Sequence, residues 1–401
     1  MIELESAVQQ ILAAIPTAAS ERVPLEHACG RVLRERLVAT LDLPTFDNSA
    51  MDGYAVRAAD VAEATLSSPV SLRLSGRVPA GESFDSEVSS GQCVRIFTGS
   101  PLPPGADAVV MQEDTHPDAA DPTKVLILDA VRPGENVRSR AADVKRGSAL
   151  AESGQVITIG SLSLLAATGV TQVSVGRLPR VGLLATGSEL REAGQSLGPG
   201  QIYESNRLML AELVRRAGGL PQVCPLVPDS AEATRRALES GLTDNDIVVT
   251  SGGVSVGEMD FVKSEFEKVG GTLHFWKVAI RPGKPFVFGR WRDKFMFGLP
   301  GNPVSAFVTF LQLAYPALRR WQGATETALP AQAATLGEPL TNPGERRHFM
   351  RVRMDSNGKV FSGGAQASHA LSSLAAANGL VDVPPRTTLS AGTTVAVIRW
   401  S

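Results

Sequence analysis

Histidine, cysteine and tyrosine are scarce in this chain. Its 401 residues include five histidines, three cysteines and three tyrosines, and the histidines are scattered. The cysteines (Cys29, Cys93 and Cys224) are far apart and odd in number, so they indicate neither a disulfide framework nor a zinc site. A metal centre built from histidines is disfavoured because the five histidines are few and scattered. The low cysteine content makes a reducing cytoplasm the expected compartment.

The sequence also lacks long apolar runs and an excess of one charge. No stretch of about 18 uncharged apolar residues occurs, so no membrane-spanning helix is expected. The net charge is -2 without a long basic run, which argues against nucleic acid as the main partner. The start, MIELESAVQQILAAIP, is acidic where a secretory signal would be basic, and its apolar spacing predicts an amphipathic helix.

Residues 181 to about 318 alternate between apolar runs of strand length and segments with helical spacing. Such alternation predicts an α/β domain with a mostly parallel sheet covered by helices on both faces. At this length about two to four domains are expected, and residues 54–140 and those after about 325 read as separate β-domains. The predicted strands of the α/β domain are 181–185, 222–227, 247–250, 273–279, 285–289 and 295–299, and its helices start near Ser205, Ala231, Met259 and Pro303.

A glycine-rich stretch, SGGVSVGEMD (251–260), follows the predicted strand 247–250. Two glycines let the backbone approach a ligand, and the helix that follows offers free N–H groups to a phosphate. The same letters also fit a plain strand-to-helix turn, or the G-x-S-x-G elbow of a serine hydrolase around Ser255. The elbow is disfavoured, because Ser251 and Gly252 separate the strand from the motif; Ser255 is therefore predicted to be a loop residue.

Charged residues gather at the same predicted sheet edge. Glu189, Asp229 and Asp260 each follow a strand, where they are either helix-start residues or ligands of a hard cation such as Mg²⁺. In HFWKVAIRPGKPF (274–286), Lys277 and Arg281 are predicted to share one face of one strand, with Lys284 after a Pro-Gly turn. These cations favour the binding of phosphate or another oxyanion.

Six long motifs resemble, in order, those of the MoeA family of molybdopterin molybdenumtransferases, which includes the E domain of gephyrin. They are FDNSAMDGYAVR (46–57), VRIFTGSPLPPGADAVVMQED (94–114), IYESNR (202–207), TSGGVSVGEMDF (250–261), FWKVAIRPGKPF (275–286) and GLPGNPVSA (298–306). The resemblance implies an elongated N-terminal helical domain (1–53 and 141–176), an inserted β-domain (54–140), an α/β molybdopterin-binding domain (177–325) and a C-terminal β-barrel-like domain (326–401).

The resemblance also implies roles for individual residues. The catalytic set is Asp52, Asp143, Glu189, Asp229, Asp260, Lys277 and Arg281, and Glu189, Asp229 and Asp260 are the implied metal ligands. The implied cofactor-binding set is Thr98, Ser251, Gly252, Gly253, Ser255, Lys284, Pro300, Gly301, Asn302, Ser305, Arg351 and Ser368, of which Lys284, Ser305, Arg351 and Ser368 lie on the molybdate side.

Four positions depart from the family pattern. Ala142 replaces an acid, Ser188 and Glu204 stand where aspartate is common, and Arg281 stands where lysine is common. Arginine keeps the charge of lysine but presents a planar fork instead of a point charge.

The implied function is insertion of molybdenum from molybdate into adenylylated molybdopterin, with Mg²⁺-dependent release of AMP. The implied assembly is a cytoplasmic homodimer that makes transient contact with the molybdopterin adenylyltransferase. Two alternatives stay open, a non-catalytic scaffold that keeps the fold and a phosphohydrolase of a nucleotide-linked substrate.

Overall fold

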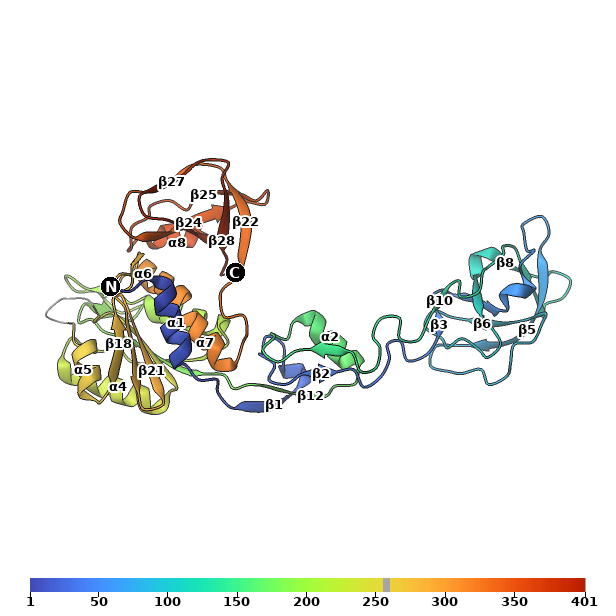
Figure 1. Ribbon diagram of the computed structural model, residues 1–401, viewed down its shortest axis with the longest axis horizontal. Helices are drawn as coiled ribbons and strands as arrows, with labels where there is room; N and C mark the ends of the chain where they lie inside the picture. The colour runs from blue at the N-terminus through green and yellow to red at the C-terminus, as the bar shows by residue number, and fades with distance from the viewer. Residues whose placement is uncertain (255–259, 401) are drawn as a thin grey trace. The chain divides into compact units, whose positions relative to one another are not determined.

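The computed structural model describes residues 1–254 and 260–400, which form two compact units (Figure 1). The core unit comprises Met1–Glu35, Ser153–Thr158 and Gln172–Ser401, and the inserted unit comprises Arg36–Glu152 and Ile159–Thr171. No helix among the described residues is long and apolar enough to cross a membrane.

A six-stranded sheet forms the centre of the core unit. Its order is β16-β13-β17-β21-β20-β18, with the first four strands parallel and the last two antiparallel to their neighbours. The prediction of a mostly parallel sheet is therefore confirmed. The strands are β13 (Arg180–Ala185), β16 (Leu220–Val223), β17 (Ile247–Ser251), β18 (Thr272–Trp276), β20 (Val287–Trp291) and β21 (Lys294–Leu299).

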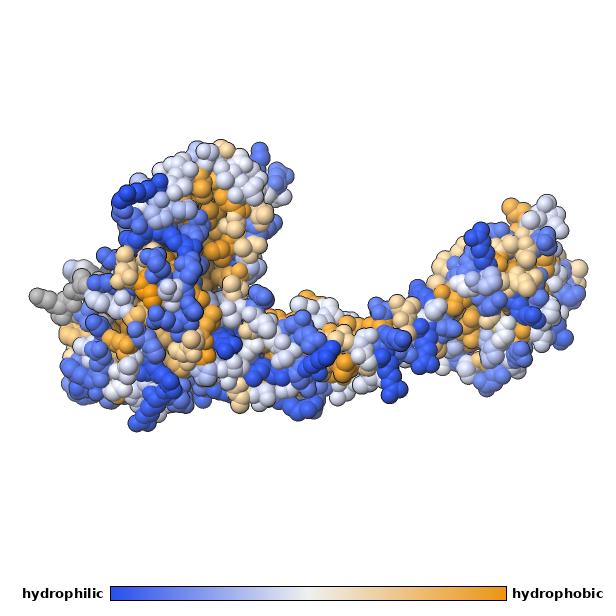
Figure 2. Space-filling model, viewed as in Figure 1, coloured by the Kyte–Doolittle hydropathy of each residue, from blue (hydrophilic) through white to orange (hydrophobic). Residues whose placement is uncertain are grey.

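Helices cover both faces of this sheet, as the alternating side chains of its strands require. Val249 of β17 joins a cluster with Leu210 and Phe307, whereas its neighbour Val248 joins another with Leu238 and Phe266. The first face carries α3 (Asn206–Arg216), α6 (Pro303–Thr309), a π-helical turn (Phe310–Ala314) and α7 (Tyr315–Gln322), and the second carries α4 (Ala231–Asp244) and α5 (Val262–Lys268). The outer side of α4 and α5 is mostly hydrophilic (Figure 2).

The first helix of the chain, α1 (Leu4–Ala14), packs in the core of the α/β sheet. Its buried Leu4, Ala7 and Ile11 belong to the same cluster as the strand residues of β13 and β21. Just before it, the backbone of Ile2 donates to Lys277 O (3.0 Å) and accepts from Ala279 N (2.8 Å). The chain then continues into β1 (Ser20–Pro24), which pairs antiparallel with β12 (Gln172–Gly176).

The end of the core unit is a separate β structure around its own core. Strand β24 (Arg347–Met354) pairs with β25 and with β26, and β25, β22, β28 and β26 pair in turn, so five strands close into a ring. The short strand β19 (Ile280–Arg281) joins β24 from outside. The remaining elements are β22 (Ala331–Leu336), β23 (Leu340–Asn342), β25 (Lys359–Ser362), α8 (Leu371–Ala376), β26 (Gly379–Val383), β27 (Thr387–Leu389) and β28 (Thr394–Ile398).

The inserted unit is built on its own six-stranded sheet, in the order β7-β4-β6-β5-β9-β8. Its core is made of small and β-branched residues such as Val56, Val110 and Ile127. The elements are β4 (Gly53–Val56), β5 (Val70–Val78), β6 (Gln92–Ile96), β7 (Ala108–Met111), β8 (Thr115–Pro117), β9 (Lys124–Ile127) and helix α2 (Ile159–Ala167), with short pairs of β2 (Leu37–Val38) with β11 (Ala149–Ala151) and β3 (Asn48–Ser49) with β10 (Val137–Arg138).

Candidate active site

Three adjoining pockets lie at the edge of the core sheet where the parallel strands β13, β17 and β21 end. This is the edge at which open α/β sheets bind ligands. The pockets have volumes of about 610, 290 and 430 Å³, and we name them the large, the carboxylate and the cation pocket. Asn302, three residues after β21, lines all three, so the pockets adjoin one another at this side chain.

The glycine-rich turn after β17 has the backbone shape that only glycine adopts easily. Gly252 and Gly253 have φ of 90° and 68°. A Cβ at Gly252 would lie 2.7 Å from the backbone oxygen of Thr186, and a Cβ at Gly253 would lie 2.6 Å from Cγ2 of Val262. The two glycines therefore let β13 and β17 end side by side beneath the carboxylate pocket. Ser255, the residue of the elbow motif, lies outside the described residues.

Gly252→Ala should destabilise the core unit by more than the backbone cost alone. A left-handed non-glycine residue costs about 1–2 kcal/mol, and the contact with the Thr186 oxygen adds strain of roughly 1–3 kcal/mol. Gly358→Ala is the matched control, because Gly358 has φ of 72° but no atom within 4 Å of its Cβ position. The free energies of unfolding in urea should rank wild type, then Gly358→Ala, then Gly252→Ala; equal losses would show that the Thr186 contact is unimportant.

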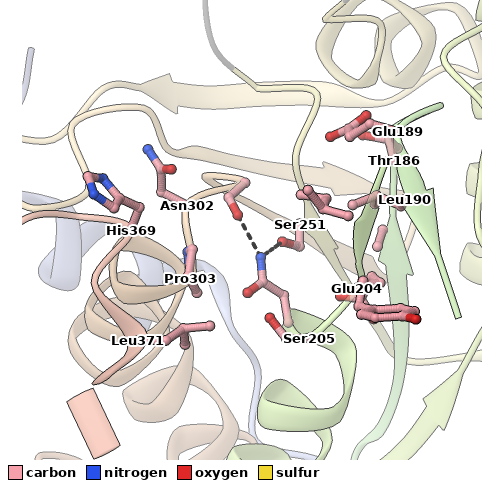
Figure 3. Close-up of a pocket in the computed structure, with 15 residues that line it drawn as sticks. Thr186, Glu189, Leu190, Glu204, Ser205, Ser251, Asn302, Pro303, His369 and Leu371 are labelled. Atoms are coloured by element: carbon pink, nitrogen blue, oxygen red, sulfur yellow. Dashed lines mark hydrogen bonds between the residues drawn. The ribbon is translucent and has the colours of Figure 1, made fainter. Parts of the chain in front are cut away.

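Asn206 forms hydrogen bonds to both the end of β17 and the loop after β21. Its Nδ2 donates both to Ser251 Oγ and to Gly301 O, each at 2.7 Å (Figure 3). Asn206 and Ser251 are both buried, and Ser251 is only 3% exposed. The loops after β17 and β21 are thus held at a fixed separation by one side chain at the start of α3.

The three predicted metal ligands, Glu189, Asp229 and Asp260, all line the carboxylate pocket. The loops of Ser188 and Asp229 are joined in both directions, since Ser188 N donates to Asp229 Oδ2 (2.9 Å) and Asp229 N donates to Ser188 Oγ (3.0 Å). Among residues 1–254 and 260–400, no three His, Cys, Asp or Glu side chains converge closely enough to hold a metal ion by themselves. This donor set fits a cation such as Mg²⁺ that takes one or two carboxylates and completes its shell with substrate phosphate and water.

The large pocket combines apolar walls with a polar floor. Leu190, Ile202, Tyr203 and Leu371 supply the apolar surface, and Ile202 and Tyr203 are about half exposed. The floor includes Glu204, Ser205, Asn206 and Ser251 (Figure 3). Such a mixture suits a flat, heterocyclic ring whose edge carries hydrogen-bonding groups.

A buried ion pair holds the wall that carries Ile202 and Tyr203. Arg207 Nε donates to Glu204 Oε2 (2.9 Å), and its Nη2 donates to Glu192 Oε1 (2.7 Å). Those hydrogen bonds raise the pKa of Arg207 although burial, the largest single influence, opposes them. Glu204, one of the departures from the family pattern, is therefore a structural partner of Arg207.

The cation pocket brings together Lys284, Ser305 and Ser368, three of the four residues implied for the molybdate side, with Arg281 of the implied catalytic set. The backbone N–H of Val304 donates to Ser368 O (3.1 Å), which joins the α6 end of the sheet to the C-terminal β structure. Two residues that sequence reasoning missed also line this pocket, Arg346 and His369. His369 lines the large pocket as well, next to Asn302 (Figure 3).

The prediction that Lys277 and Arg281 share one face of one strand is wrong. Strand β18 ends at Trp276, Lys277 has φ of 71°, and Ile280–Arg281 pair with β24 in the other sheet. The Lys277 Nζ lies 3.6 Å from the centre of the Trp276 ring, where cation–π attraction holds it. Lys277 is thus absent from the residues lining the three pockets.

Arg351 does not line the cation pocket either, although its guanidinium supports it. The side chain is fully buried; Nη2 donates to Ala365 O (2.6 Å) and Ala367 O (3.1 Å), and Nε to Ser373 Oγ (2.9 Å). Burial lowers the pKa of Arg351. Its position therefore fixes the loop that carries Ser368.

Asp52, Thr98 and Asp143 fold in the inserted unit. Both the backbone N–H and the Oγ of Thr98 donate to Asp52 Oδ1 at 2.8 Å, and these hydrogen bonds lower the pKa of Asp52. Asp143 is exposed. The structure thus pairs two of these three residues and leaves their roles as predictions.

Family models cover nearly all of the chain. Residues 2–169 match the MoeA N-terminal region (domain I and II), residues 182–320 match a probable molybdopterin binding domain, and residues 333–400 match the MoeA C-terminal region (domain IV).

Relatives match over the same extent. The chain is 36% identical to the molybdopterin molybdenumtransferase of Haemophilus influenzae over 99% of this chain and 98% of that protein. It is 41% identical to molybdopterin molybdenumtransferase 2 of Mycobacterium tuberculosis over 90% of each. A crystal structure of the molybdopterin biosynthesis MoeA protein from Pyrococcus horikoshii OT3 matches with a TM-score of 0.85 and 31% identity over the whole of both chains.

Proposed function

Because the chain belongs to the MoeA family of molybdopterin molybdenumtransferases, we propose that it inserts molybdenum from molybdate into adenylylated molybdopterin and releases AMP with Mg²⁺. The proposal rests mainly on one observation: the carboxylate pocket, the cation pocket and the large pocket all share Asn302 as a lining residue. Each pocket suits a different part of this reaction.

In the carboxylate pocket, Asp229 and Asp260 would hold Mg²⁺, with Glu189 beside them. When bound, the ion neutralises negative charge on the phosphate oxygens as the pyrophosphate bond breaks. The Gly252–Gly253 turn contributes a close approach of backbone to the phosphates. The reciprocal hydrogen bonds between Ser188 and Asp229 keep this carboxylate in place before the substrate arrives.

In the cation pocket, Arg281 and Lys284 would bind molybdate, which is a substrate. Ser305 is only 4% exposed, and Ser368 sits on the loop that Arg351 holds, so the backbone of both serines is fixed at the pocket. Two cations and two hydroxyl donors match a tetrahedral dianion. Molybdate bound here would lie next to Asn302, and therefore next to the contents of both other pockets.

The large pocket would take the ring system of the cofactor. Its apolar walls would cover the ring faces, and its polar floor would meet the ring edge. We further infer a cytoplasmic homodimer and a transient contact with the molybdopterin adenylyltransferase from the resemblance of the chain to its family.

The test is AMP release from adenylylated molybdopterin, measured with and without molybdate and Mg²⁺. We expect AMP release only when both are present, because Mg²⁺ neutralises the phosphate charge and molybdate supplies the molybdenum whose insertion accompanies the release. Release that needs Mg²⁺ but is indifferent to molybdate would favour a phosphohydrolase. No release in any mixture by folded protein would favour a scaffold and overturn the proposal.

A further inference from the structure

We propose that Arg346 is the third cation of the cation pocket and the residue that holds Arg281 in it. The inference rests on the proposed oxyanion role of that pocket and adds a binding and positioning residue to it. Arg346 lies one residue before β24, and its side chain lines the pocket together with Arg281 and Lys284.

Arg346 contacts the short strand that carries Arg281. Its Nη1 donates to Ile280 O at 2.6 Å. Because Ile280–Arg281 form a strand of only two residues, which pairs with Arg347 and His348, this bond is a large part of what fixes Arg281. With one guanidinium nitrogen used in this way, the remaining N–H groups of Arg346 are left for a ligand.

The turn that presents Arg346 is itself rigid. Asn342 is completely buried, and its Nδ2 donates to Arg346 O (2.8 Å) and Val383 O (3.0 Å). The same turn passes close to the other arginine, since a Cβ at Gly344 would lie 3.6 Å from Arg281 Nη1. The Arg281 guanidinium therefore lies against the turn that carries Arg346.

No acid compensates these charges in the part of the chain that is described. Neither Arg281, Lys284 nor Arg346 forms an ion pair there, whereas the next arginine, Arg347, pairs with both Asp382 and Glu5. Burial, and next the positive charge of Arg281, lower the pKa of Arg346. Arg281 and Arg346 are half-buried and Lys284 is exposed, and like charges gathered without a counter-charge are unfavourable until an anion binds among them.

The buried His348, which pairs with Arg281 in the sheet, is surrounded by the same positive charges. His348, the register partner of Arg281, is 2% exposed, and neither of its ring nitrogens has a hydrogen-bond partner within residues 1–254 and 260–400. Burial, followed by the charges of Arg281, Arg351 and Arg346, lowers the pKa of His348 to about 4. The imidazole therefore stays neutral and adds no charge of its own, so the arginines and Lys284 define the pocket.

Molybdate titrated into the full chain, by calorimetry at fixed pH and ionic strength, tests the inference. Arg346→Gln should raise the Kd for molybdate by about 10- to 100-fold, the loss expected for a charged hydrogen bond. Arg346→Lys keeps the charge but not the fork, so its Kd should rise less, by about threefold to tenfold. Arg353→Gln, an equal charge change at an exposed site in β24, should leave the Kd within about twofold.

A second measurement separates a binding role from a merely structural one. In the AMP-release assay, Arg346→Gln should raise the molybdate concentration for half-maximal rate and leave the rate at saturating molybdate close to wild type. If Arg346→Gln leaves the affinity for molybdate unchanged while Lys284→Ala weakens it, the inference about Arg346 is wrong, and the proposed oxyanion role of the pocket still stands. Wild-type protein that binds no molybdate would overturn the proposed pocket, and with it the inference.

Discussion

Replacing Asp229 or Asp260 with alanine should slow AMP release from adenylylated molybdopterin by about 100-fold or more. Both carboxylates line the pocket beside the glycine turn, and neutralisation of developing phosphate charge by a held cation contributes several kcal/mol. Asp229→Asn should be nearly as slow, because it keeps an oxygen for Ser188 N but loses the charge.

Asp293→Ala provides the matched control for these variants. Asp293 is an exposed carboxylate in the turn between β20 and β21, at the end of β21 opposite the site. Rates should be measured over a range of Mg²⁺ concentrations after folding has been checked by circular dichroism. Near-normal rates in Asp229→Ala and Asp260→Ala would remove both residues from the cation site.

Lys284→Ala should raise the molybdate concentration for half-maximal AMP release by about 10- to 100-fold. The lysine lines the cation pocket and has no carboxylate partner among the described residues, so its charge is available to an oxyanion. The affinity for the adenylylated cofactor should change much less, because the large and carboxylate pockets lack Lys284 among their lining residues.

Lys359→Ala, which removes an exposed lysine from strand β25, is the comparison for the Lys284 variant. A Lys284→Ala protein whose molybdate dependence is unchanged while its cofactor affinity falls would mean that the roles of the pockets are wrongly divided.

The sequence predicts much of the core sheet because the evidence for it is local. Strand-length apolar runs and amphipathic segments alternate from residue 181 onward, and the structure confirms strands and helices there in the predicted order. Gly252 and Gly253 could be recognised as a close approach of backbone, since glycine adopts a positive φ at the least cost and has no Cβ to block a neighbour. The Asn302–Pro303 helix start is likewise a short-range signal, although the Asn302 side chain makes no capping bond.

The cation pocket shows where local reasoning fails. Alternation along residues 274–286 predicts one strand, yet the chain turns at Lys277 and crosses to a second sheet at Ile280. Nothing within those residues encodes the partner strand β24. Similarly, Arg346 and Arg347 are two adjacent arginines that the sequence does not distinguish. Arg347 forms ion pairs with Asp382 and Glu5, which are distant in the sequence, whereas Arg346 forms none with the described residues.

The position of α1 in the α/β core has a consequence for synthesis on the ribosome. An 11-residue helix is marginal alone in water, and the elements that pack on α1, the π-helical turn and α7, come only at Phe310–Ala314 and Tyr315–Gln322. At about 5–20 residues per second, the apolar stripe of α1 waits on the order of tens of seconds for these partners, while the inserted unit is completed first. A helix that emerges before the inserted unit is thus buried after it, which makes α1 a natural target for chaperones that hold nascent chains.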